Sequence, residues 1–180
     1  MAGAGMDVLL TRREHTCPTE AERAALAETA EVDLLLSLHV DASPSMHAEG
    51  LTTFHFGDAS GATSTVGEAL AGYVRRELVS RTGMLDRGTQ AGTWPLLRLI
   101  RTPAVRVQVG YLSNMGDRRR LLDPVFRDVV AEGLLVAVKR FYLQGEDDQP
   151  TGTFTFSDVL AHELERNGPS RPRRGGAHRR

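Results

Sequence analysis

Apolar and polar residues follow two periodicities along the first 143 positions, and together they predict strands interleaved with helices. Short, nearly continuous apolar runs of strand length lie at 6–11, 32–39 and 105–109. Such runs are typical of buried strands, and we expect 32–39 to be covered on both faces of a sheet. Residues 50–57 alternate between apolar and polar, with Leu51, Thr53 and His55 on one side, so we expect a strand nearer an edge.

Helical spacing of apolar residues predicts helices at 18–30, 64–81 and 123–142. Thr19 is the expected N-cap of the first, and Glu22 three residues later completes a capping box. Asp86–Gly88 has the composition of a turn. Strands alternating with helices indicate an α/β domain, which we place at residues 1–144.

Residues 145–180 have the composition of a tail that follows this domain. It begins with an acidic linker, continues with the strictly alternating segment 151–156 and a short helix candidate at 157–166, and ends in a basic stretch expected to be disordered. Spacing alone leaves two interpretations of Thr151, Thr153 and Thr155 open. They are sites for a kinase, or they belong to a β-prone segment that docks on the domain.

Charge, apolar content and cysteine content limit the kinds of partner and environment that we expect for this chain. The net charge is −1, but the residues after Glu165 carry six arginines and no acid, so the rest of the chain is acidic. A basic end can bind nucleic acid or anionic lipid, but a solvated end is the simpler interpretation and we expect no nucleic-acid partner. No run approaches the roughly 20 apolar residues of a membrane span. Cys17 is the one cysteine, so no internal disulfide is expected.

Two motifs indicate a family. Residues 103–114 read P-A-V-R-V-Q-V-G-Y-L-S-N, and residues 32–42 read V-D-L-L-L-S-L-H-V-D-A, with D-R-G at 86–88 and L-R at 97–98 between them. In this order they resemble the zinc-dependent N-acetylmuramoyl-L-alanine amidases, which cleave the bond between glycan and peptide in peptidoglycan. The resemblance covers about residues 6–143. It implies a phosphorylase/hydrolase-like three-layer α/β sandwich, with a mixed, mostly parallel sheet flanked by helices.

The resemblance also implies zinc-dependent hydrolysis, but one residue at the expected catalytic position does not fit that reaction. The family binds zinc through His, Glu and His, and a further Glu acts as general base on the metal-bound water. His39 matches one ligand position, whereas Gln108 stands at the catalytic Glu position. An amide cannot take that proton. The family's other two ligands belong to its first strand and helix, which this chain is expected to lack, so His39 is the one retained ligand and zinc binding is expected to be absent or weak.

Other residues of the chain could in principle replace the missing zinc ligands. His15, His47, Glu49 and His55 are the candidates for a rebuilt metal site, although none of them has helical ligand spacing. Arg106 shares a strand face with Gln108, about 6.6–6.8 Å away along the strand. Unless an acid pairs with Arg106, its charge opposes a divalent metal.

Within the family, the chain resembles the CwlM-type proteins of actinobacteria. This resemblance implies a cytoplasmic regulator of peptidoglycan precursor synthesis, acting through a Ser/Thr kinase and a MurA-type enzyme, with Thr151, Thr153 and Thr155 as candidate phosphosites. Met1–Arg13 lacks the order of a signal peptide, which favours the cytoplasm unless a signal peptide lies upstream. The alternative is an active zinc amidase of peptidoglycan catabolism, seen as a fragment. Peptidoglycan or its precursors are the expected ligands in both cases.

Overall fold

A four-stranded sheet organises residues 5–143, the part of the chain that this computed structural model describes. Its strands are β1 (Leu35–Asp41), β2 (Leu51–Phe56), β3 (Asp86–Gly92) and β4 (Ala104–Tyr111), in the order β1-β4-β2-β3. β1 pairs with β4 in parallel, β2 pairs with β3 in parallel, and β2 and β4 are antiparallel. The predicted mixed, mostly parallel sheet is therefore confirmed. The predicted tail at 145–180 lies outside the described residues.

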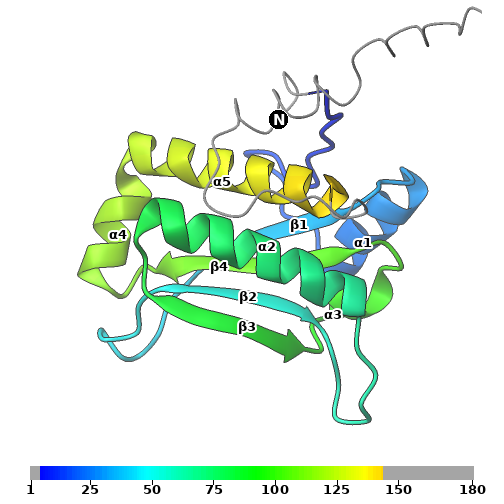
Figure 1. Ribbon diagram of the computed structural model, residues 1–180, viewed down its shortest axis with the longest axis horizontal. Coiled ribbons are helices and arrows are strands. Elements are labelled where there is room, and N and C mark those ends of the chain that lie inside the picture. Colours follow the sequence, from blue (N-terminus) through cyan, green and yellow to red (C-terminus); the bar gives the residue numbers. More distant parts are fainter. Residues whose placement is uncertain (1–4, 144–180) are drawn as a thin grey trace, which may run out of the picture.

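Helices cover both faces of this sheet, as Figure 1 shows. They are α1 (Glu20–Thr29), α2 (Thr65–Thr82), α3 (Pro95–Leu99), α4 (Met115–Leu122) and α5 (Pro124–Leu143). α2 packs on the sheet and α5 packs on α2, whereas α1 and α3 pack together on the opposite face. The capping box predicted at Thr19 and Glu22 is present, and Gly83 ends α2 in the left-handed conformation.

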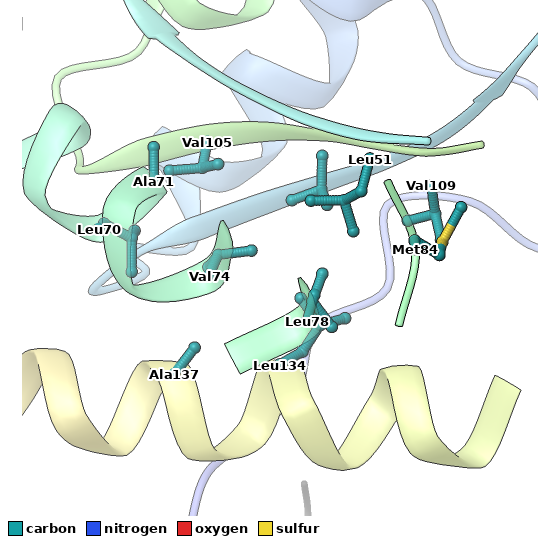
Figure 2. Close-up of a cluster of buried hydrophobic side chains, with 11 residues drawn as sticks. Leu51, Leu70, Ala71, Val74, Leu78, Met84, Val105, Val109, Leu134 and Ala137 are labelled. Carbon is teal, nitrogen blue, oxygen red and sulfur yellow. The ribbon is translucent and has the colours of Figure 1, made fainter. Parts of the chain in front are cut away.

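The larger hydrophobic core lies between the sheet and α2 with α5 (Figure 2). Leu70, Val74 and Leu78 of α2 are fully buried there, as their helical spacing predicts. The side chains of β4 that reach this core are Val105, Val107 and Val109. Because side chains alternate across a strand, β4 must send Arg106 and Gln108 to the opposite face, beneath α1 and α3. The valine run therefore determines on which face the candidate site lies.

The strand predicted at Met6–Thr11 is wrong. These residues form no strand, and Val8, Leu9 and Leu10 are 48%, 47% and 68% exposed. No backbone hydrogen bond joins this segment to β1 within residues 5–143. An apolar run supplies side chains for a strand, but a strand also needs a partner for its backbone groups, and here it has none.

Two further predictions about the sheet need correction. β2 was expected near an edge but lies inside the sheet between β4 and β3, where its first five residues are buried. Asp86–Gly88 was expected to be a turn but begins β3, which is an edge strand of the described sheet. β3 reads D-R-G-T-Q-A-G, without apolar alternation, so backbone pairing with β2 rather than side-chain burial holds it.

Candidate functional site

The two residues that the motifs single out lie side by side on neighbouring strands. His39 of β1 is in register with Gln108 of β4, which is in register with Thr52 of β2. One step away, Ser37 aligns with Arg106. These side chains occupy the sheet face that α1 and α3 cover, so the polar face of β4 forms the candidate site.

Arg106 joins this sheet face to the helices above it. Its Nη1 lies 3.2 Å from Glu20 Oε1 at the start of α1, and its guanidinium lies 5.0 Å from the centre of the Trp94 ring. The other carboxylate oxygen of Glu20 accepts a hydrogen bond from the backbone N–H of Leu96 in α3. Burial lowers the pKa of Arg106, and the charge of Glu20 opposes that shift. Of the two possibilities that the sequence left open for Arg106, the structure has the one in which an acid pairs with it.

These surroundings disfavour the protonated form of His39. Its Nε2 lies 2.7 Å from Ser37 Oγ and 3.3 Å from Arg106 Nη1. A guanidinium has only donors, so Nε2 accepts that bond and the imidazole proton is placed on Nδ1. Burial lowers the pKa of His39, and the charge of Arg106 lowers it further. The lone pair that a metal would need is thus already engaged.

Gln108 shows why its position cannot act as a base. The side chain is 5% exposed, and its Nε2 has no hydrogen-bond partner among residues 5–143; the same holds for Nε of Arg106. A buried N–H group without an acceptor carries an energetic cost of about 1–3 kcal/mol. Gln108 therefore places an amide, which cannot take up a proton, where metal-dependent hydrolysis uses a carboxylate base.

The zinc donor set does not fit this site. Within the described residues, no three His, Cys, Asp or Glu side chains come together to hold a metal ion. His15, His47 and Glu49 are exposed. His55 is buried on the other face of β2, where Nδ1 lies 3.0 Å from the carbonyl oxygen of Phe56. The rebuilt metal site considered from the sequence is not formed among these residues.

Comparison with known proteins settles the family. A sequence profile of the N-acetylmuramoyl-L-alanine amidases matches residues 1–140. The chain belongs to this family. It is 48% identical over 164 residues to the N-acetylmuramoyl-L-alanine amidase CwlM of Mycobacterium tuberculosis, and the match covers 91% of this chain. The chain spans 40% of that relative's length.

Solved structures confirm the amidase fold. The catalytic domain of the amidase CwlV from Bacillus (Paenibacillus) polymyxa superposes with a TM-score of 0.69 at 28% identity, covering 78% of this chain and 74% of that chain. An N-acetylmuramoyl-L-alanine amidase from Clostridium difficile gives a TM-score of 0.70 at 27% identity, with 78% and 73% covered. The family and fold expected from the motifs are thus confirmed.

Sequence reasoning found Arg106, His39 and Gln108 but missed three residues that fix their state. Ser37 lies two positions before His39 on the same strand face, and this spacing was a usable signal. Glu20 and Trp94 come from elements distant in the sequence, and Glu20 is 86 positions from Arg106. No local sequence pattern predicts a contact between residues so far apart in the chain.

The lowered pKa of His39 predicts a pH dependence of stability. The unfolded chain protonates this imidazole near pH 6.5. In the folded site, burial and the charges of Arg106 and Arg23 oppose the cation more than Glu20 and Asp41 favour it, so the pKa is lower. Its contribution to stability is present above about pH 6.5 and is lost as the pH falls through that value toward the folded pKa. We expect His39→Gln to flatten the fall in unfolding free energy between about pH 7 and pH 5, measured by urea denaturation.

The exposed His47 supplies the matched control for this experiment, and His47→Gln should retain the full pH dependence. Equal slopes for the two variants would show that Arg106 and burial do not hold His39 neutral.

Proposed function

We propose that this chain is a non-catalytic amidase-fold domain that regulates peptidoglycan synthesis. The observation that carries the proposal is the position of Arg106, whose guanidinium lies 3.3 Å from Nε2 of His39 and 3.2 Å from Glu20. A paired cation therefore stands beside the one side chain that matches a zinc-ligand position of the family.

Two physical arguments support the loss of hydrolysis. A metal ion on His39 Nε2 would have to displace Arg106 Nη1, which lies 3.3 Å from that nitrogen and uses the same lone pair. In addition, general-base catalysis typically contributes about 10²–10⁴-fold to a rate, and Gln108 has no basic atom with which to supply it.

An active zinc amidase of peptidoglycan catabolism is the second candidate. The family assignment favours it, as does the register that keeps His39 beside Gln108, because this arrangement resembles a retained site framework. The chain spans 40% of the length of its M. tuberculosis relative, so a longer product would bring further residues to this question.

The regulatory half of the proposal rests on the resemblance to CwlM-type proteins. Under this proposal the protein is cytoplasmic and binds peptidoglycan or its precursors through the amidase fold. A MurA-type enzyme is the proposed protein partner, and a Ser/Thr kinase would act on Thr151, Thr153 or Thr155. No helix within residues 5–143 is long and apolar enough to cross a bilayer.

Hydrolysis gives the test of the site. We expect the full chain, supplied with zinc, to leave the amide bond of a muropeptide intact, as measured by chromatography of the glycan and peptide products. Gln108→Glu should also remain inactive, because the variant restores a carboxylate but no metal ligands. Cleavage that disappears in His39→Ala and persists in His47→Ala would contradict the proposal.

Intact mass gives the test of the regulatory tail. Protein isolated from its native cells under conditions in which the kinase is active should lose the mass of one or more phosphates after phosphatase treatment. A variant with alanine at Thr151, Thr153 and Thr155 should show no such loss. An unchanged mass for the unaltered protein would remove the phosphorylation hypothesis.

A further inference from the structure

Helix α4 presents apolar side chains to solvent. Asp117 is 1% exposed and Leu121 packs against the larger core, so these two residues mark the inner side of the helix. Because successive residues of an α-helix are rotated by about 100°, the opposite side carries Met115, Arg119 and Leu122. Met115 and Leu122 are 59% and 71% exposed. The outward face of α4 is therefore apolar near both ends of the helix and basic between them.

Two neighbouring segments extend this surface. Asn114 caps α4, and its Nδ2 donates a hydrogen bond to the carbonyl oxygen of Met46 at 3.0 Å. Met46, which is 73% exposed, therefore lies beside the start of the helix. Leu112, two residues before the cap, is 50% exposed. We call the following residues the α4 ridge: Met46, Leu112, Met115, Arg118, Arg119 and Leu122.

Buried hydrogen bonds hold the α4 ridge in one shape. Oδ2 of Asp117 accepts the backbone N–H of Gly50 at 2.9 Å and that of Tyr111 at 3.1 Å. Ser113 Oγ accepts the backbone N–H of Ser43 at 3.0 Å. All of these residues lie between positions 43 and 122, inside the described part of the chain. A surface that is already ordered loses little conformational freedom when it binds a partner.

The charge of the α4 ridge is positive. Arg118, Arg119 and Arg120 are consecutive and exposed. Arg120 lies 3.8 Å from the buried Asp117, whereas Arg118 and Arg119 form no ion pair within residues 5–143. The next acid along the chain is Asp123, whose Oδ1 accepts a backbone N–H in the first turn of α5. Two cations therefore stand beside the apolar residues without a partner of opposite charge in the described structure.

This combination of residues matches one kind of surface. Segments that lie at a membrane interface bury leucine and methionine side chains at the edge of the acyl region, while neighbouring arginines reach the lipid phosphates. The charge of an anionic leaflet complements Arg118 and Arg119. α4 also lies at one end of the molecule, as Figure 1 shows. The outward face of a helix is convex, so it suits a flat bilayer better than a peptide, which binds in a groove or along a strand edge.

We propose that the α4 ridge binds the surface of an anionic lipid bilayer. Met115 and Leu122 enter the headgroup region, and Arg118 and Arg119 contact the phosphates. The ligand is the assembled bilayer rather than a free phosphate, because the apolar side chains need an acyl boundary to enter. The proposal does not depend on whether the candidate site hydrolyses peptidoglycan.

A fluorescent probe on the ridge of the full 180-residue chain tests the proposal. In a Cys17→Ser background, Leu122→Cys would carry an environment-sensitive label. Its emission should shift to shorter wavelength on vesicles of phosphatidylglycerol and phosphatidylcholine at about 1:2, but not on phosphatidylcholine alone or with glycerol phosphate in solution. This local signal is needed because the six arginines after Glu165 can attract the same vesicles.

Helix α3 supplies the matched control for the probe. Leu99 is 49% exposed, and α3 lies at the opposite end of the sheet from α4 in Figure 1. The same label on Leu99→Cys should therefore keep its emission unchanged on both kinds of vesicle.

A second pair of variants tests the charges. Arg118→Gln combined with Arg119→Gln should raise the lipid concentration at half-maximal shift by about tenfold or more. Arg98→Gln combined with Arg101→Gln removes the same charge from exposed positions around α3 and should raise it by no more than about threefold. Equal urea midpoints would confirm that all variants are folded.

Several results would overturn the proposal. A probe at position 122 that gives no shift on anionic vesicles would exclude lipid and leave the ridge to a protein partner. The proposal also fails if the probe at position 99 shifts as much, if neutral vesicles or glycerol phosphate give the same shift, or if the two double variants weaken binding equally.

Discussion

The charge of Arg106 is the constraint on which the candidate site depends. A guanidinium on a half-buried sheet face needs a partner, and Glu20 supplies it from α1 at 3.2 Å. The same carboxylate accepts the Leu96 N–H, so one acid ties α1, α3 and β4 together. Arg106 also lies against Trp94 and directs a donor at His39. The contacts that hold the helices on this face therefore also determine the state of the imidazole.

This arrangement separates the residues that hold the fold from those of the candidate site. The family framework rests on the other face of β4, where Val105, Val107 and Val109 pack against α2. Alternation along the strand separates that core from Arg106 and Gln108, so the polar face can change while the valines keep the sheet in place. Fold and site are under separate physical constraints, although both are carried by one strand.

The sequence predicted most of the fold because its signals were local. The capping box at Thr19, the stop at Gly83 and the valine alternation of β4 each act within a few residues, and the structure has all three. The predictions for Met6–Thr11 and for β3 were wrong because backbone hydrogen bonding to a neighbouring strand determines whether each segment is a strand. Within residues 5–143 the apolar run at Met6–Thr11 has no such neighbour, whereas the polar segment β3 pairs with β2. Of the site, His39, Arg106 and Gln108 were predictable from a motif and its spacing. The partner Glu20 was not, because tertiary packing alone brings it to Arg106.

The zinc affinity of the full chain tests most directly whether Arg106 and its partners have replaced a metal site. Competition with a chelator of known affinity would measure it, with His39→Ala and His47→Ala compared in parallel. We expect no site tighter than about 1 μM and no difference between the two variants. One equivalent of zinc bound with a nanomolar dissociation constant, lost in His39→Ala and kept in His47→Ala, would contradict the account.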